Sequence, residues 1–303
     1  MKIPSKVYPY RLPYMGSKQN IAYSIMMAIV QKKPKVKYFF DIFGGGAAMS
    51  LMAKQFGLKV YYTEKNAGIV NLLNFLKDNK IPKEWIKWID REEFKKCLGK
   101  DDPYSVFVTV VWSFGNNRQA YLFGKDVEEY KRLAFEVIVN LDHDCLEKLK
   151  QKSGLNLRMP KQNNLHERRL DFSRQIKSIK GFNRGCPELI QIQSLTQLEC
   201  CSRLQQLEYL QQLDLPYDEV VIYCDPPYRN TAEYTDNDFN YKEFDEWVKK
   251  LKYDVFISEY NCPFEKIASF GKMSLLNNSK EKKPLISDNL YLHKAEVLWP
   301  EPN

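Results

Sequence analysis

Residues 36–64 read VKYFFDIFGGGAAMSLMAKQFGLKVYYTE, a stretch in which strand, turn and helix patterns follow one another. The apolar run 36–43 is typical of a buried strand, a glycine turn follows it, and an apolar helix pattern covers about 47–56. A second strand is expected at 59–63 and a second helix at about 68–77. Strands that alternate with helices form parallel sheets with right-handed crossovers, so this stretch predicts an α/β fold.

The glycine turn of this stretch is typical of a nucleotide site. Glycines allow the backbone to approach a ligand closely, and the N-terminus of the following helix favours acidic groups. Glu64 stands at the tip of the second strand, where an acid about 20 residues after a glycine turn holds a ribose in nucleotide-binding sheets. This spacing predicts an adenosine-containing cofactor but does not identify it.

A second motif follows the apolar run 220–223 and reads Cys224-Asp225-Pro226-Pro227-Tyr228. Two prolines cannot continue a strand, and they lock the backbone into a rigid turn. The turn would place one carboxylate, one proline carbonyl and one aromatic ring around a small volume. Such a volume suits a planar ring with an exocyclic amino group, because the two oxygens accept the amino hydrogens while the ring stacks on the tyrosine.

Together these motifs resemble those of the Dam-type DNA adenine-N6 methyltransferases, the alpha group of amino-methyltransferases, in that group's order along the chain. The resemblance covers roughly residues 10–80 and 218–299, where 255–258 resembles the next core strand, and it is weak between them. It implies S-adenosylmethionine as cofactor and a Rossmann-like methyltransferase sheet, mostly parallel with a C-terminal antiparallel hairpin. It also implies an inserted, mainly helical target-recognition domain.

The resemblance assigns roles to individual residues. The catalytic motif is Asp225, Pro226, Pro227 and Tyr228. The cofactor-binding residues are Tyr14, Met15, Gly16, Lys18, Asp41, Phe43, Gly44, Gly45, Gly46, Glu64, Asn66 and Asp225. Among them, residues 14–18 would help to hold the methionine end and Glu64 the ribose hydroxyls. Ala47 departs from the pattern, because the family usually has its second glycine there; we interpret this as variation within a turn that Gly45 and Gly46 keep permissive.

The resemblance also implies a mechanism. Asp225 and the Pro226 carbonyl would accept the two hydrogens of the adenine amino group, and the methyl group would move directly to nitrogen, in line and without a covalent enzyme intermediate. Positioning and charge placement would supply most of the rate, and no metal is needed. Because a base inside a duplex cannot reach such a pocket, the target would be flipped out and stacked on Tyr228.

Charge indicates a nucleic-acid partner. The chain of 303 residues has a net charge of +8, and the segment 148–184 alone carries +9, with eleven basic against two acidic side chains. A concentrated basic stretch is typical of proteins that bind a polyanion, here double-stranded DNA. We expect DNA contacts from Lys161, Arg168 and Arg169 in this segment and from Lys280 and Lys282 in the polar loop 277–283.

The segment 112–119, Trp-Ser-Phe-Gly-Asn-Asn-Arg-Gln, suits a loop or hairpin that meets DNA. Arginine bonds naturally to guanine, and asparagine or glutamine to adenine. The resembled family has an aromatic Gly-Asn segment near this place that helps to probe the site. We therefore expect Asn116, Asn117 and Arg118 to contact bases or to insert into the base stack; a purely structural hairpin turn is the alternative.

The motifs predict a catalytic domain made of residues 1–82 and 216–303 and an inserted DNA-binding region at 83–215. The longest helix of the insert is expected at about 127–150. An amphipathic helix around Phe244 and strands near 254–258 and 289–299 would complete the sheet. The stretch 189–215, rich in leucine and glutamine, has leucines at about every third residue, which fits neither a helix nor a strand, and it stays unassigned.

Seven scattered cysteines without a CxxC pair, and only three histidines, argue against a zinc site and for reduced thiols. No apolar run approaches the length of a membrane span. We therefore expect a cytoplasmic protein without a metal.

Three alternatives stay open on the sequence: methylation of cytosine-N4 in DNA, methylation of adenine in RNA, and a non-catalytic nucleic-acid-binding protein with a methyltransferase fold. The alpha order and the aspartate at the head of the catalytic motif favour adenine. A cognate restriction endonuclease as partner, a phage origin and a regulatory role are all compatible with the sequence.

Overall fold

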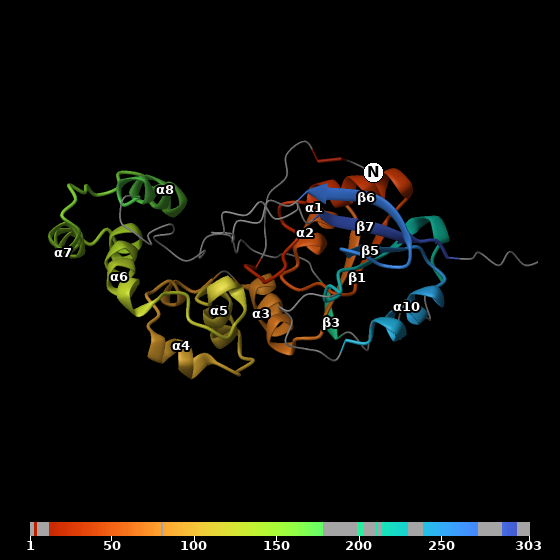
Figure 1. The fold of residues 1–303 in the computed structure, drawn as a ribbon, viewed down its shortest axis with the longest axis horizontal. Coiled ribbons are helices and arrows are strands. Elements are labelled where there is room, and N and C mark those ends of the chain that lie inside the picture. The colour runs from red at the N-terminus through yellow and green to blue at the C-terminus, as the bar shows by residue number, and fades with distance from the viewer. Residues whose placement is uncertain are drawn as a thin grey trace, which may run out of the picture. The chain divides into compact units, whose positions relative to one another are not determined.

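The computed structural model describes residues 3–4, 12–79, 81–177, 199–202, 210, 214–229, 239–271 and 287–295 (Figure 1). These residues divide into two compact units. The first unit combines residues 3–4 and Ser17–Val70 with the described residues from 199 onward, and the second combines residues 12–16 with the described residues of 71–177. The division therefore falls earlier than the predicted boundaries at 82/83 and 215/216. The assignment of catalysis to one part and target recognition to the other stays a prediction.

The first unit is built on a sheet of seven strands among the described residues, in the order β3-β2-β1-β4-β5-β7-β6. The strands are β1 (Tyr38–Asp41), β2 (Lys59–Glu64), β3 (Glu199–Ser202), β4 (Val220–Cys224), β5 (Val255–Glu259), β6 (Glu265–Gly271) and β7 (Ser287–His293). β3, β2, β1, β4 and β5 are parallel, and β7 is antiparallel to both β5 and β6. This confirms the predicted sheet, mostly parallel with antiparallel C-terminal strands; β3 and β6 were not predicted.

The order of strands reverses between β1 and β4. From β1 the chain proceeds outward through β2 to β3, whereas β4 and β5 lie on the other side of β1. Asp41, the last residue of β1, lies opposite Tyr62 of β2 and Tyr223 of β4. In open α/β sheets ligands bind at such a reversal, outside the carboxyl ends of the strands. The topology thus points to the ends of β1 and β4 as the ligand site.

Helices cover both faces of this sheet: α1 (Ala22–Lys32), α2 (Ala48–Gln55) and α10 (Tyr241–Lys249), with α3 (Ala67–Asp78) leading out of the unit. Phe244 of α10 belongs to a buried cluster with Phe40 and Ile222. Ser50 of α2 instead reaches Asp41, whose side chain points to the opposite face from that of Phe40 because strand side chains alternate. α10 and α2 therefore pack on opposite faces.

A buried ion pair lies near the amino ends of the strands. The Nζ atom of Lys33, just after α1, is 3.0 Å from a carboxylate oxygen of Asp254, just before β5, and both side chains are less than a tenth exposed. Lys33 also donates to the carbonyl of Tyr217 at 3.1 Å, and the Tyr217 hydroxyl donates to Asp254. The backbone N–H of Ala295, after β7, donates to the same carboxylate at 3.1 Å. Asp254 thus links four segments that are distant in the sequence.

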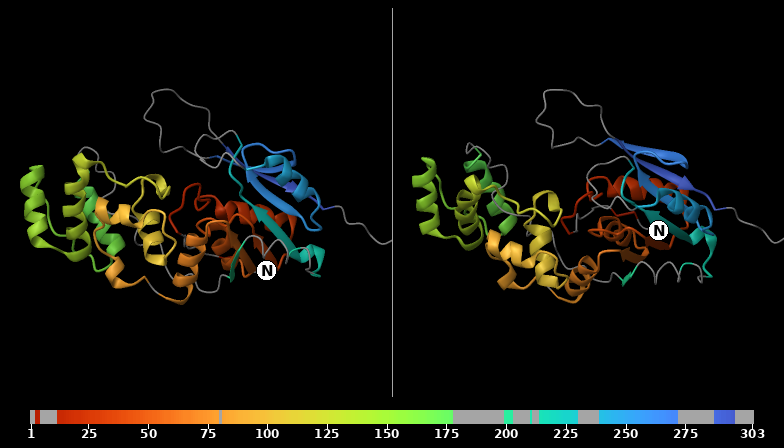
Figure 2. Two further views of the ribbon diagram at one scale, coloured as in Figure 1. Left: turned by 90° about the horizontal axis from the view of Figure 1, so that it is seen from below. Right: turned by 60° about the horizontal axis from the view of Figure 1, so that its bottom comes forward.

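The second unit is mainly helical, as predicted for the insert. Its helices are α4 (Arg91–Cys97), α5 (Pro103–Val111), α6 (Lys125–Asn140), α7 (His143–Ser153) and α8 (Leu165–Gln175), and α6 and α7 run side by side (Figure 2). Four of these helices begin at a side chain that accepts a backbone N–H of the first turn, which satisfies a donor that the helix itself cannot. These N-caps are Asp90, Asp102, Asp142 and Asn164.

The single helix predicted at 127–150 is wrong, because two helices occupy this range. Leu141 adopts a left-handed conformation with φ of 54°, which ends α6, and the Asp142 carboxylate then accepts the Cys145 N–H at 2.9 Å to start α7. Apolar side chains on both sides of the break face inward, so the apolar pattern continues through it. The apolar periodicity of the sequence therefore did not reveal that a single left-handed residue, Leu141, divides this range into two helices.

Candidate active site

The glycine turn after β1 is tied to β2 by three hydrogen bonds. The Gly44 N–H donates to the Thr63 carbonyl at 2.8 Å, the Tyr62 hydroxyl donates to the Gly45 carbonyl at 2.7 Å, and the Gly45 N–H donates to Oε2 of Glu64 at 2.9 Å. A Cβ atom on Gly44 would lie 2.1 Å from the Tyr62 ring, so only glycine fits there. The turn is thus held rigidly beside the tip of β2.

Glu64 accepts hydrogen bonds with both carboxylate oxygens, one from the glycine turn and one from the segment before α3. Oε2 accepts from Gly45, and Oε1 accepts from the Asn66 N–H at 2.9 Å. Each carboxylate oxygen has two acceptor positions, so the group retains capacity for further donors such as ribose hydroxyls. The Asn66 side chain accepts the Ile69 N–H at 3.2 Å, which gives this predicted cofactor residue a structural part at the start of α3.

Ala47, which departs from the resembled pattern, takes the conformation that glycine prefers. Its φ is 63° at the N-cap of α2, and its N–H closes the turn on the Gly44 carbonyl at 2.8 Å. A left-handed conformation costs an alanine roughly 1–2 kcal/mol. The turn therefore keeps its geometry in spite of the extra methyl group.

Asp41, at the end of β1, is a buried carboxyl group with an unsatisfied atom. The Ser50 hydroxyl donates to its Oδ2 at 2.6 Å, whereas its Oδ1 has no hydrogen-bond partner among the described residues. Burial raises the pKa of Asp41 to about 7, opposed by the Ser50 bond and reinforced by the charges of Asp225 and Glu64. Three acidic groups therefore gather at the carboxyl ends of β1, β2 and β4, a setting that favours a cationic ligand.

Asp225, the first residue after β4, is paired with Lys18. Lys18 Nζ lies 2.8 Å from Oδ2 of Asp225 and 4.6 Å from the centre of the Tyr228 ring, and its side chain is only 4% exposed. The lysine ammonium therefore neutralises the Asp225 carboxylate and also covers the Tyr228 ring. The resemblance assigned Lys18 to the methionine end of the cofactor; the structure places it against Asp225 and Tyr228.

The Tyr228 side chain lies near Tyr260, which follows β5, and is affected by the charge of Asp288 in β7. Tyr260 packs against it nearly at right angles, with ring centroids 4.5 Å apart. Burial and the charges of Asp225 and Asp288 raise the pKa of the Tyr228 hydroxyl far above its usual range. Asp288 is itself only 1% exposed. Lys18 thus covers the face of the Tyr228 ring, and Tyr260 packs against the same ring.

Four further predicted cofactor residues differ in where they lie. Tyr14, Met15 and Gly16 belong to the second unit, so their part in cofactor binding stays a prediction. Phe43 packs edge-on against Phe239 and Phe244, with ring centroids 5.8 Å apart in each case. Phe43 thus anchors the glycine turn on the side of α10.

In the second unit, the segment 112–122 forms the turn that the sequence suggested. Ser113 pairs with Tyr121, the Phe114 N–H donates to the Ala120 carbonyl at 2.8 Å, and the Arg118 N–H donates to the Ser113 hydroxyl at 3.0 Å. Within the turn, φ is 63° at Gly115, 57° at Asn116 and 61° at Arg118. Phe114 is 59% exposed at this turn although its neighbour Trp112 is fully buried. The exposed Phe114 ring is therefore carried by a turn whose backbone is fixed by hydrogen bonds.

The predicted DNA-contacting residues differ in exposure and in the hydrogen bonds that they form within the protein. The Asn116 amide donates to the Val110 carbonyl, and the Asn117 side chain accepts two N–H groups of the turn. The Arg168 guanidinium donates to the carbonyls of residues 138, 139 and 163, which ties α8 to the end of α6. Lys161 is exposed and Arg169 half-buried, while Lys280 and Lys282 lie outside the described residues. DNA contact by any of them stays a prediction.

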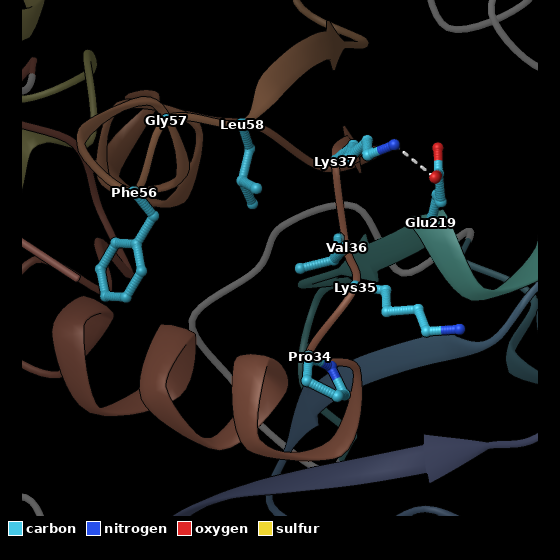
Figure 3. Close-up of a pocket in the computed structure, with 8 residues that line it drawn as sticks. All are labelled: Pro34, Lys35, Val36, Lys37, Phe56, Gly57, Leu58 and Glu219. Carbon is cyan, nitrogen blue, oxygen red and sulfur yellow. Dashed lines mark hydrogen bonds and ion pairs between the residues drawn. The ribbon is translucent and has the colours of Figure 1, made fainter. Parts of the chain in front are cut away.

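A separate groove of about 510 Å³ lies at the opposite end of the sheet. It is lined by apolar residues such as Val36 and Leu58, which precede β1 and β2, and its rim includes the ion pair of Lys37 with Glu219 (Figure 3). Because ligands of α/β sheets bind at the carboxyl ends of the strands, this groove is not the candidate active site.

Among the residues that the structure describes, no group of three or more His, Cys, Asp or Glu side chains could hold a metal ion. No helix in the same part of the chain has the length and hydropathy needed to cross a membrane.

The sequence did not reveal Ser50, Asp288 or Phe114 as parts of these sites. Ser50 and Asp288 carry no local signal, since each acts on a residue brought near by the fold. Phe114 lies in the segment 112–119 that the sequence singled out, but the sequence did not distinguish its exposed ring from the buried ring of Trp112.

One family model matches the chain, that of the D12 class N6 adenine-specific DNA methyltransferases, over residues 14–283. A comparison with curated proteins gave no match.

Proposed function

The chain belongs to the D12 class of N6 adenine-specific DNA methyltransferases, and we propose that the carboxyl ends of β1, β2 and β4 hold its S-adenosylmethionine and its target adenine. One observation carries this proposal. Asp41, Glu64 and Asp225 converge at the reversal of strand order, with Lys18 and Tyr228 against Asp225. Motifs in the order glycine turn before catalytic turn support the Dam-type, alpha subgroup.

The residues at this place suit the cofactor. Glu64 retains acceptor capacity for ribose hydroxyls, and glycines in the turn before α2 allow the backbone to approach the nucleoside closely. The unsatisfied Oδ1 of Asp41 offers a buried acceptor to a positively charged group. S-adenosylmethionine, when bound, supplies the electrophilic methyl group.

Asp225, the Pro226 carbonyl and Tyr228 then act on the adenine. The carboxylate and the carbonyl accept the amino hydrogens, which favours a more tetrahedral nitrogen, and the tyrosine ring stacks on a base flipped out of the duplex. Because Lys18 covers this ring, its ammonium group must leave the ring face when the base enters. Positioning and charge placement supply most of the rate.

Protonation of Asp41 gives the cofactor assignment its first test. A cationic ligand stabilises the ionised form, so binding lowers the pKa of Asp41 from about 7 and releases a proton below that pH. The affinity for S-adenosylmethionine should therefore rise as pH increases from 5.5 to 7.5, by up to about tenfold per unit below pH 7. In the Asp41→Asn variant this dependence should disappear. Isothermal titration calorimetry over this pH range measures both.

Wild-type protein that binds no S-adenosylmethionine at any pH would remove the cofactor assignment. Binding with the same pH dependence in wild type and Asp41→Asn would keep the cofactor but place its charge away from Asp41.

We assign target recognition to the second unit. Exposed basic side chains gather there on and around α7 and α8, namely Lys148, Lys152, Arg158, Lys161, Arg174 and Lys177. The rigid turn that carries Phe114 supports a second role, since exposed apolar side chains act as wedges between base steps. We propose that Phe114 inserts into the base stack, with Asn117 and Arg118 at the base edges.

Replacing Phe114 with alanine should weaken DNA binding by about 1–3 kcal/mol, the usual worth of an aromatic ring stacked on a base. The affinity for S-adenosylmethionine should not change. Leu98→Ala is the matched control, because Leu98 is an exposed apolar residue of the same unit at 38% exposure. Fluorescence anisotropy with duplex DNA measures both variants. Equal DNA affinities of the two variants would exclude Phe114 from the interface.

The buried thiols Cys97, Cys145, Cys224 and Cys262 form no disulfide with one another, which supports a cytoplasmic enzyme. Partnership with a cognate restriction endonuclease stays a prediction.

A further inference from the structure

The turn at residues 225–228, which carries the proposed catalytic groups, forms few backbone hydrogen bonds of its own. Pro226 and Pro227 have no N–H group, so neither can donate to a neighbouring strand. The pairing of β4 with β5 ends where Cys224 lies opposite Ile257. The turn therefore leaves the sheet after Cys224, and its far end requires another attachment if the catalytic groups are to keep fixed positions.

The side chain of Glu259 supplies this attachment. Glu259 is the last residue of β5, two residues beyond Ile257, and is only 1% exposed. Its Oε1 accepts the N–H of Arg229 at 2.6 Å, and its Oε2 accepts the N–H of Tyr260. Arg229 directly follows Tyr228. A single carboxylate thus holds the backbone beside both tyrosine rings.

The side chain of Arg229 completes the arrangement. One guanidinium nitrogen lies 2.6 Å from Asp245 of α10 and another lies 3.8 Å from Glu259, while the group as a whole lies over the Tyr241 ring at 5.0 Å. Burial raises the pKa of Glu259, but the N–H groups of Arg229, Tyr260 and Asn261 favour its carboxylate form. Glu259 is therefore surrounded by donors as a buried acceptor should be.

We propose that Glu259 is a positioning residue for methyl transfer, acting through the N–H groups of Arg229 and Tyr260 to hold the two tyrosine rings where the target base is received. This inference rests on the proposed role of Tyr228. A glutamine at this position has the same size but only one accepting oxygen, so one of the two N–H groups would face an amide NH₂. The turn would then shift, and a displacement of about 1 Å in a reacting group costs about 100-fold in rate.

The test compares Glu259→Gln with two other variants. In Glu259→Gln, kcat at saturating DNA and cofactor should fall about 10- to 100-fold. The Kd for S-adenosylmethionine should stay within about twofold, and circular dichroism should show a folded protein at the assay temperature. Arg229→Ala removes the guanidinium but keeps the backbone N–H, so its kcat should fall much less. Glu246→Gln, which alters an exposed pair with Lys249 on α10, is the control and should match wild type.

The outcomes separate this inference from the proposed function. Wild-type protein without methyl transfer would contradict the proposed function itself. If wild type is active and folded Glu259→Gln keeps the wild-type kcat, Glu259 has only a structural part. A loss in Arg229→Ala equal to that in Glu259→Gln would also overturn the inference, because the guanidinium and not the backbone would then be the acting group.

Discussion

Replacing Asp225 with alanine should lower the rate of methyl transfer about 1,000-fold, the upper range for removing one preorganised polar group from an active site. The alanine cannot accept the amino hydrogens of the base, whereas the glycine turn and Glu64 still hold the cofactor. S-adenosylmethionine should therefore still bind. Single-turnover transfer to DNA, together with equilibrium binding of the cofactor, measures the two effects separately.

The ion pair with Lys18 requires a control for this variant. Removing the carboxylate leaves an ammonium group with 4% exposure beside it, which lowers stability independently of catalysis. Asp225→Asn preserves the volume and one accepting oxygen, so its rate should fall less, by about 100-fold. Asp218→Ala alters an exposed carboxylate and should transfer at the wild-type rate. Near-normal transfer by folded Asp225→Ala would remove Asp225 from the mechanism.

Replacing Asp254 with alanine should have the largest effect on stability. The variant leaves the buried Lys33 ammonium without its opposite charge and the Ala295 N–H without its acceptor. Breaking a buried ion pair by removing one partner costs about 3–5 kcal/mol, because the remaining charge is buried and uncompensated. For a unit of this size the unfolding midpoint should fall by roughly 10 °C. Thermal unfolding followed by circular dichroism measures the shift.

Asp218 again provides the comparison. Its pair with Lys35 has the same chemistry and a similar N–O distance of 2.8 Å, but the two side chains are 49% and 75% exposed. Solvent screens such a pair, so Asp218→Ala should unfold near the wild-type midpoint. Equal midpoints for the Asp254 and Asp218 variants would show that the buried network adds no stability.

The parts of the site that could be predicted from the sequence are those encoded by local backbone chemistry. Glycines mark the turn after β1 because Gly44 leaves no space for a Cβ atom beside Tyr62. Two prolines mark the end of β4 because they cannot extend a ladder. Glu64 could be predicted as a site residue from its place at the tip of the next strand, β2. In each case the residue type itself restricts the geometry.

The parts that could not be predicted depend on the sheet as a whole. β3 lies in the leucine- and glutamine-rich stretch that no period explained, and it is defined by its pairing with β2. β6, at the sheet edge, is mostly exposed or half-buried and has no continuous apolar run. The contacts of Lys33 with Asp254 and of Glu259 with Arg229 join residues distant in the chain. Local periodicity carries no information on such pairs.

The most direct test of this account is transfer of a labelled methyl group from S-adenosylmethionine to unmethylated duplex DNA, followed by nucleoside analysis of the digest. The account predicts label in N6-methyladenine deoxynucleoside, and its loss in Asp225→Ala. Label in N4-methylcytosine, or in RNA but not in DNA, would contradict the assignment of adenine in DNA as the target of this site.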